Sequence, residues 1–356
     1  MKISGHLAVR LHILWQRKGL VSALLLPFSW LTRLAIALRQ YHYRRHPEKV
    51  GHSRHPVVVV GNLYVGGTGK TPVVIALTQA MQERGWRPGI ISRGYGARVG
   101  DLALAGQGNL DPTRFGDEPV LIAAATGVPL AVHPQRILAL RELEQSFPEV
   151  DLVIADDGLQ HLGLGRDIEI VVQDERGLGN GRILPAGPLR EPPAKLAEVD
   201  FLITNLGSYQ RSNRPTPAPL HTHARELAMR LRPAEVTHLI SKTSLEWAQW
   251  QTRYSGVSVS AVAGIGHPER FFSMLNAAGL QLDHTLALPD HYPYERSPFN
   301  GIPSDIILIT AKDAVKCARF AEDRLWVVRP AIEFSDNTWL DDLHGSLKAI
   351  ARKKSA

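Results

Sequence analysis

The chain has 356 residues, of which 44% are apolar and 21% are charged, proportions that are ordinary for a folded soluble protein. A chain of this length can form two domains, or one large core with additions. Its single cysteine, Cys317, excludes an internal disulfide and indicates a reducing compartment. We expect Cys317 to be a packing residue rather than a nucleophile.

The positive charge is concentrated at the N-terminus. Residues 1–56 contain ten Lys or Arg and one acid, Glu48, so they carry +9, and the rest of the chain carries +7 − 9 = −2. A main body that is close to neutral argues against nucleic acid as a partner. A basic N-terminus instead favours contact with an anionic membrane surface.

The N-terminal segment also contains an apolar run from Leu20 to Leu38, which Pro27 and Arg33 interrupt. No small-residue cleavage site follows, so we expect no signal peptide. The run could form a helix pair packed on its own domain, or a helix lying in the membrane interface. We favour the interfacial helix over one that spans the bilayer. The aromatic and basic residues suited to the interface are Trp30, Arg39, Tyr41, Tyr43, Arg44 and Arg45.

From residue 57 onward, short apolar strands alternate with helices. Residues 57–60 are a β-branched run typical of a buried parallel strand, and a glycine-rich loop, a helix over 71–84 and a strand over 89–92 follow. The same alternation continues through 115–132, 149–161, 167–174 and 199–207. The pattern predicts an α/β fold, with a parallel sheet covered by helices on both faces.

The composition changes after Gly207, where a polar, proline-rich stretch resembles a linker. Two more strand–loop–helix units follow, in 257–280 and 305–320. The predicted parts are a membrane-associated helical segment 1–56, a core 57–210 with the glycine-rich loop, a linker 211–224, and a smaller C-terminal α/β lobe 225–356.

The stretch GNLYVGGTGKTP, residues 61–72, has the features of a phosphate-binding loop. A Walker A loop is G-x-x-x-x-G-K-[ST] between a strand and a helix, and here Tyr64 replaces its first glycine. A glycine-rich loop alone is often a tight turn, but the matching flanks favour a nucleotide site, with ATP and Mg²⁺. The residues expected to bind them are Gly66, Gly67, Thr68, Gly69, Lys70 and Thr71.

Two pairs of acids accompany this loop. Asp156 and Asp157 end a predicted strand, where a Walker B acid would hold Mg²⁺, although DDG is also a common turn. Asp117 and Glu118 stand at the start of a predicted helix, where Asp117 alone would be interpreted as a cap. Because four acids exceed the needs of Mg²⁺, one of them is a candidate general base toward an acceptor hydroxyl.

Eight motifs occur in order between residues 61 and 316: GNLYVGGTGKTP, SRGYG, GDEPVLIA, DDGLQH, RILPAGPLRE, AVAGIGHPERFF, LPDHYPY and TAKDAVK. Together they resemble the tetraacyldisaccharide 4′-kinases of lipid A biosynthesis. The loop of that family is GN-x-x-x-GG-x-GKTP, which fits residues 61–72 and leaves Tyr64 at a variable position.

The resemblance implies a P-loop kinase at the cytoplasmic face of the bacterial inner membrane, bound peripherally. It would move the γ-phosphate of ATP to the 4′-hydroxyl of an acylated glucosamine disaccharide 1-phosphate, giving lipid IVA. We expect a monomer.

By the same resemblance, Asp117 would be the catalytic base, His291 its partner, and Arg190 a catalytic arginine. Lys70 would contact the phosphates. The group associated with Mg²⁺ would be Thr71, Glu118, Asp156 and Asp157, and which of these acids touches the metal stays open.

The chain departs from the family at Ala311, where TAKDAVK has lost a usual Glu. It also holds two Asp-His pairs, Asp283-His284 and Asp290-His291, and the aromatic YPY after the second favours His291.

Lys312 and Asp313 are candidates for contact with the nucleotide base, with plain surface charge as the alternative. Three other functions remain open: a P-loop ATPase of the partitioning type, a cytosolic small-molecule kinase, and a membrane-associated scaffold without activity.

Overall fold

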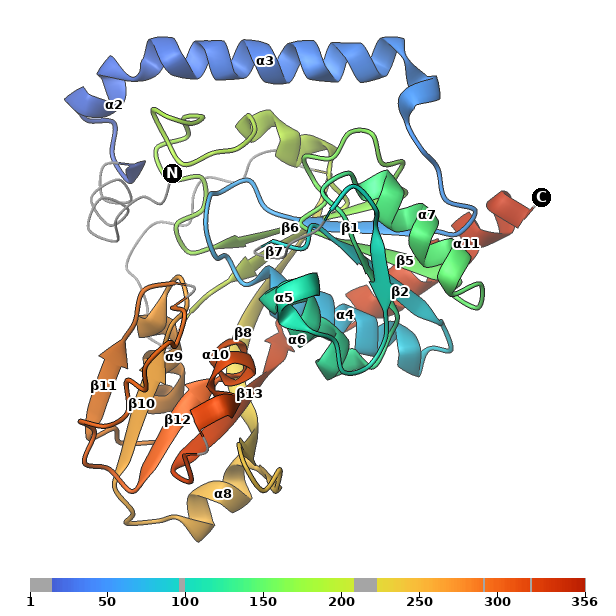
Figure 1. Ribbon diagram of the computed structural model, residues 1–356. Coiled ribbons are helices and arrows are strands. Elements are labelled where there is room, and N and C mark those ends of the chain that lie inside the picture. Colours follow the sequence, from blue (N-terminus) through green and yellow to red (C-terminus); the bar gives the residue numbers. More distant parts are fainter. Residues whose placement is uncertain (1–14, 96–99, 208–222, 291, 321, 356) are drawn as a thin grey trace. The chain divides into compact units, whose positions relative to one another are not determined.

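The computed structural model describes residues 15–95, 100–207, 223–290, 292–320 and 322–355. They form two compact units (Figure 1). The first comprises the described residues of Met1–Asn205, Asn213–Ala228 and Phe334–Ala356, and the second those of Leu206–Ser212 and Met229–Glu333. The C-terminal segment from Phe334 therefore belongs to the first unit, whereas the sequence predicts a C-terminal lobe that extends over 225–356. Residues 1–14, most of the expected linker, and His291 lie outside the described residues.

The first unit is built on a sheet with the strand order β7-β6-β1-β5-β2-β4-β3. Its strands are β1 (Val57–Gly61), β2 (Pro88–Ser92), β3 (Leu104–Gly106), β4 (Leu130–Val132), β5 (Leu152–Asp156), β6 (Ile168–Asp174) and β7 (Phe201–Asn205). Among these described strands, β3 pairs antiparallel with β4 and the other pairs are parallel. The predicted parallel sheet is confirmed.

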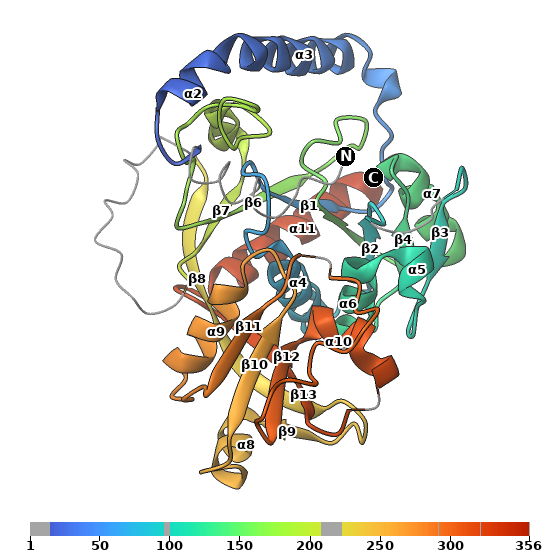
Figure 2. The ribbon, with the colours of Figure 1, turned by 60° about the vertical axis from the view of Figure 1, so that its left-hand side comes forward.

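Helices lie on both faces of this sheet (Figure 2). They are α4 (Lys70–Glu83), α5 (Pro112–Phe115), α6 (Asp117–Thr126), α7 (Arg136–Ser146) and α11 (Trp339–Ser355), with the short η2 (Pro193–Glu198). Val57 and Val59 of β1 share a core cluster with Leu140 and Leu143 of α7. Because side chains alternate along a strand, the other residues of β1 face away from α7.

The last helix joins the first unit through aromatic packing. Trp339 is fully buried, and its ring lies 5.4 Å from the ring of Phe201 on β7 and 5.1 Å from that of Phe334. Arg84 at the end of α4 also pairs with Asp341, at 2.7 Å. These contacts explain why the segment from residue 334 onward packs with the phosphate-loop unit.

Strand β1 lies at the point where the strand order reverses, with β5 on one side and β6 on the other. In open α/β sheets, ligands bind at the carboxyl ends of the strands at such a switch point. The loop after β1 and the two acids at the end of β5 therefore both lie at the usual ligand position.

In the second unit the strands follow the order β11-β10-β12-β13-β8, and β9 pairs with β8. Its elements are β8 (Arg225–His238), β9 (Ser244–Glu246), α8 (Trp247–Arg253), β10 (Val259–Ala263), α9 (Pro268–Ala277), β11 (His284–Ala287), β12 (Ile306–Thr310), α10 (Ala311–Cys317), η3 (Ala318–Phe320) and β13 (Leu325–Phe334). Cys317 is fully buried in this core, and burial raises the pKa of its thiol to about 12. It packs as expected.

The N-terminal helices are α2 (Leu20–Leu24) and α3 (Leu26–Arg45), followed by η1 (Pro47–Lys49). Among the described residues of α2 and α3, the buried ones are Ser22 and Ser29. Their exposed side chains include nine large apolar ones: Leu20, Val21, Leu24, Phe28, Trp30, Leu31, Leu34, Leu38 and Tyr41. In the part of the chain that the structure describes, no helix combines the length and apolarity needed to cross a bilayer.

Candidate active site

The loop between β1 and α4 is shaped by the side chain of Asn62, which is fully buried. Its amide donates hydrogen bonds to the carbonyl oxygens of Tyr64 at 2.7 Å and Gly66 at 3.1 Å, and to the Thr68 hydroxyl at 3.3 Å. Gly66 and Gly69 have φ angles of 102° and 100°, which strain any residue with a Cβ. The glycines permit the curvature, and Asn62 holds it.

Lys70 is the first residue of α4, and it contacts both the loop and the acid that follows β5. Its Nζ lies 3.2 Å from Asn62 Oδ1 and 3.3 Å from Asp157 Oδ1. Arg190 also reaches this carboxylate, with Nη1 at 3.0 and 3.2 Å from its two oxygens. Burial pushes the pKa of Asp157 upward, but Lys70 and Arg190 together lower it to about 2. Two cations thus converge at the N-terminus of a helix, where an anion is favoured.

Asp156 lies deeper than Asp157 and has the opposite electrostatics. It is 3% exposed and accepts a hydrogen bond from the Ser92 hydroxyl at 3.0 Å. Burial, then the charges of Glu118 and Asp157, raise its pKa to about 6. The influence of Glu118 links the first turn of α6 to this strand end.

This crowding of acids fits a divalent cation, because a bound cation would remove the electrostatic penalty that raises the pKa of Asp156. Among the described residues, no three His, Cys, Asp or Glu side chains are grouped so as to hold a metal by themselves. Mg²⁺ in nucleotide enzymes is held by one or two carboxylates together with phosphate oxygens. The predicted group of Thr71, Glu118, Asp156 and Asp157 stays a prediction.

Replacing Asp156 by Asn is expected to stabilise the unliganded protein at pH 8 by about 1–3 kcal/mol, although it removes a candidate metal ligand. Because the folded-state pKa of about 6 exceeds the reference value of 3.8, the wild type loses stability as pH rises from about 4 to 6. The variant does not. Urea unfolding in the presence of a chelator should show a larger advantage at pH 8 than at pH 5. An Asn variant no more stable than wild type at pH 8 would contradict the buried-charge assignment.

Arg136 is a functional residue that sequence reasoning missed. It is 1% exposed and donates to the carbonyl oxygens of His133 at 3.0 Å, Asp156 at 3.3 Å and Asp157 at 3.4 Å. It therefore holds the backbone that carries both acids. Burial lowers its own pKa to about 10, and burial and the nearby Arg136 charge lower the pKa of His161 to about 4. His161 is consequently neutral at pH 7.

Tyr64, which replaces the first Walker glycine, is 2% exposed and packs against Arg176. The Arg176 guanidinium lies 4.2 Å from the centre of the Tyr64 ring, a cation–π distance. Arg176 also pairs with Asp174 at 2.6 Å and donates to the Gly67 carbonyl at 3.3 Å. On the same side of the loop, the Asn205 amide donates to the Thr68 carbonyl at 3.2 Å. Arg176, just after β6, and Asn205, at the end of β7, therefore hold the backbone of the loop around Gly67 and Thr68.

Asp117 and Glu118 form the first turn of α6, and Asp117 is half-buried. The preceding Gly116 has a φ of 91°, and a Cβ there would lie 2.6 Å from the Tyr95 carbonyl oxygen. Only glycine fits this approach, which explains the glycine in GDEP. Thr71 is half-buried in the first turn of α4.

The candidates in the second unit have structural contacts of their own. Asp313 is buried and accepts hydrogen bonds from the Gly264 N–H at 3.1 Å and the Thr310 hydroxyl at 2.6 Å. Lys312 pairs with Asp290 at 3.2 Å. His291 lies outside the described residues, so its pairing with Asp117 stays a prediction.

Comparisons with known proteins show the family of the chain. The family model for tetraacyldisaccharide-1-P 4′-kinase matches residues 21–348. The chain is 51% identical to a tetraacyldisaccharide 4′-kinase of Bordetella petrii over 95% of each chain, and 42% identical to one of Herminiimonas arsenicoxydans over 94% of each.

A solved structure is also similar: the "apo" form of LpxK from Aquifex aeolicus in complex with ATP. The TM-score is 0.76 at 26% identity, and the match covers 92% of this chain and 99% of that one. The loop, the acids after β5 and Arg190 all lie within the region that the family model matches. The chain therefore belongs to the tetraacyldisaccharide-1-P 4′-kinase family.

Proposed function

We propose that the chain transfers the γ-phosphate of ATP to the 4′-hydroxyl of a tetraacyldisaccharide 1-phosphate. The observation that carries this proposal is the convergence of Lys70 and Arg190 on Asp157 beside the phosphate loop. Family membership supports the choice of acceptor. ATP is the nucleotide present in the similar LpxK structure.

Each residue of the site would have a separate role in an in-line phosphoryl transfer. Backbone N–H groups of the loop and the Lys70 ammonium would hold the β- and γ-phosphates, and Arg190 would offset charge on the transferred group. Asp117 would take the proton of the 4′-hydroxyl as its oxygen bonds to the γ-phosphorus. The bond from that phosphorus to the β-bridging oxygen breaks, and ADP leaves.

The Thr71 hydroxyl and the acids Glu118, Asp156 and Asp157 are the residues that would hold Mg²⁺. When bound, Mg²⁺ neutralises charge on the phosphate oxygens. Asp157 is suited to this environment because its pKa of about 2 keeps it ionised at every working pH. His291 remains a predicted partner of Asp117.

The test is one assay with the full chain, ATP, Mg²⁺ and an acylated glucosamine disaccharide 1-phosphate in detergent micelles. We expect a product that carries phosphate at the 4′-position. ATP hydrolysis without transfer to the lipid would favour a partitioning-type ATPase. Transfer to soluble sugars but not to the lipid would favour a small-molecule kinase, and the absence of ATP binding would favour a scaffold.

We further propose that α2 and α3 bind the cytoplasmic surface of the inner membrane. Most of the large apolar side chains of these helices are exposed, while serines make the buried contacts. An acylated acceptor is costly to extract from a bilayer, at about 0.8 kcal/mol per buried CH₂, so the enzyme must reach it in place. A helix with an apolar exposed face and basic residues at its end is suited to that position.

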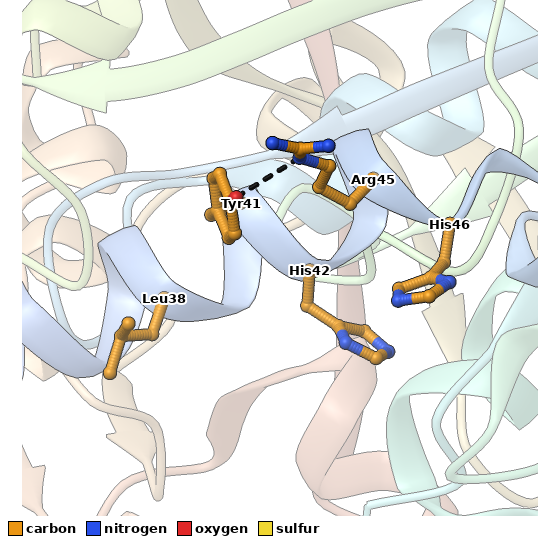
Figure 3. A pocket seen from close by; sticks show the side chains of 5 residues that line it. All are labelled: Leu38, Tyr41, His42, Arg45 and His46. Atoms are coloured by element: carbon orange, nitrogen blue, oxygen red, sulfur yellow. Dashed lines mark hydrogen bonds between the residues drawn. The ribbon is translucent and has the colours of Figure 1, made fainter.

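The C-terminal end of α3 adds a depression lined by Leu38, Tyr41, His42, Arg45 and His46 (Figure 3). Arg45 donates to the Tyr41 hydroxyl at 3.0 Å, so an aromatic and a cation stand side by side. Aromatic and basic side chains of this kind favour the headgroup region of a membrane.

Replacing Leu31 and Leu34 together by Glu is expected to lower partitioning onto anionic vesicles at least about tenfold, because two exposed apolar side chains become charged. Sedimentation with vesicles measures this directly. The control is Ser346→Glu with Ala349→Glu, which adds the same charge to exposed positions of α11. Equal partitioning of the two variants would refute membrane contact by α3.

A further inference from the structure

The loop between β6 and η2 is tied to the N-terminal helices by the two buried serines. Ser22 donates to the Ala186 carbonyl oxygen at 2.5 Å. Ser29 donates to the Ile183 carbonyl oxygen at 2.8 Å and accepts the Ala186 N–H at 2.9 Å. These bonds provide hydrogen-bond partners for backbone groups of a loop, which have no partners in a regular strand or helix. Alanine at Ser29 would remove the partner of the Ala186 N–H, and alanine at Ser22 would remove one of the two side-chain donors to the Ala186 carbonyl oxygen.

Asn180 and Trp15 extend the same junction. The Asn180 amide, 5% exposed at the residue level, donates to the Ser22 hydroxyl and to the Ala186 carbonyl oxygen, both at 3.0 Å. The Trp15 indole donates to the Pro185 carbonyl oxygen at 3.0 Å, and the Asn180 N–H bonds the Trp15 carbonyl oxygen at 2.9 Å. The junction is thus a network of buried polar contacts rather than an apolar seam.

The other end of the same loop pairs with the phosphate loop. The Val65 N–H bonds the Pro188 carbonyl oxygen at 2.9 Å, and the Arg190 N–H bonds the Leu63 carbonyl oxygen at 2.7 Å. Between these bonds, Tyr64 and Leu189 form an antiparallel bridge. The loop that the two serines bond therefore also pairs with the phosphate loop. The same pairing places Arg190 within reach of Asp157.

Gly179 lies where the N-terminal segment, the phosphate loop and the loop between β6 and η2 come together. A Cβ at this position would lie 2.9 Å from Pro188, 3.1 Å from the Trp15 carbonyl oxygen and 3.2 Å from the Tyr64 ring. Its φ of +57° also favours glycine. The N-terminal segment, the phosphate loop and the intervening loop are in close contact at this residue.

We propose that residues 179–190, here called the connector, make the geometry of the phosphate loop and of Arg190 depend on the seating of α2 and α3. Ser22, Ser29 and Asn180 are then positioning residues, which act on the reaction through the connector. The inference rests on the proposed function for the identity of the reaction. It goes beyond that proposal because it gives the N-terminal helices a second role besides membrane contact.

The test is the double variant Ser22→Ala with Ser29→Ala, measured with saturating lipid in micelles so that membrane contact does not limit the rate. The loss of one hydrogen bond typically changes an equilibrium constant by about 2- to 12-fold. We therefore expect KM for ATP to rise about 3- to 10-fold and kcat to fall. Partitioning onto vesicles should stay unchanged, because the exposed apolar side chains remain.

Thr32→Ala is the matched control, because the Thr32 hydroxyl bonds the Phe28 carbonyl oxygen of its own helix. The dissociation constant of ATP, measured by equilibrium dialysis without lipid, should follow KM. This readout remains valid if the chain proves not to use the lipid acceptor, so it separates failure of the inference from failure of the proposed function. If the double variant does not fold, Ser29→Ala alone should shift both constants in the same direction by less.

Two results would overturn the inference. One is a double variant whose affinity for ATP and kcat equal those of Thr32→Ala. The other is reduced vesicle partitioning with unchanged ATP affinity, which would limit the serines to attaching the helices.

Discussion

Lys70→Met is expected to lower kcat/KM for phosphate transfer by about 10³, the usual scale for losing a charge that stabilises a transferring phosphoryl group. In the unliganded site Lys70 is shared between Asn62 and Asp157. Since its ammonium lies at the start of α4, it adds to the positive end of the helix where the phosphates would bind. Initial rates over a range of ATP concentrations measure the loss.

Lys195→Met is the matched control for this variant. Both lysine side chains are 13% exposed and both pair with an acid, Lys195 with Glu169 at 2.7 Å. We expect the control to lose stability but to keep its kinetic constants. If Lys70→Met kept more than about a tenth of the wild-type kcat/KM, Lys70 would be only a structural partner of Asp157.

The parts of the site with local sequence signals were predicted. The loop, both pairs of acids, and the strand and helix that carry them follow from short patterns. A parallel sheet brings strand ends to one edge, which places the loop and Asp156 together. Tyr64 occupies the position of the first Walker glycine, and the Arg176 guanidinium over its ring explains how a large side chain is accommodated there.

The supporting residues had no such signal. Arg136 and Arg176 act through carbonyl oxygens and rings that lie far away in the sequence, and no spacing rule reports such contacts. The same reason hid the place of the last helix, which depends on Trp339 meeting Phe201. For Ser22 and Ser29 the sequence pattern points the wrong way. In an apolar run one expects the apolar side chains to be buried, but in α2 and α3 the buried side chains are these two serines.

Asp117→Asn is expected to lower kcat by about 10³, within the range that a positioned general base contributes. The amide keeps the size of the side chain but cannot take the proton of the acceptor hydroxyl. Binding of ATP should change little, because the lost charge in the first turn of α6 is worth only about 0.3–1 kcal/mol. The assay is a single-turnover measurement of 4′-phosphate formation with ATP and lipid both saturating.

Asp111→Asn is the control, because it is the same substitution at an acid whose role is purely structural. Asp111 caps α5 by accepting the Thr113 N–H at 2.9 Å and the Thr113 hydroxyl at 2.8 Å. We expect it to leave kcat unchanged.

The pH profile separates a base from a purely structural acid at Asp117, which the structure places in the first turn of α6 rather than at its cap, Gly116. The wild-type kcat should rise with pH as the base loses its proton, and this acidic limb should be absent from the residual activity of Asp117→Asn. If Asp117 were only a stabilising charge in the first turn of α6, its replacement would instead lower the free energy of unfolding and leave kcat and its pH dependence unchanged. An Asp117 variant that behaved like Asp111→Asn in both respects would remove the base from the mechanism and leave the acceptor proton to another acid.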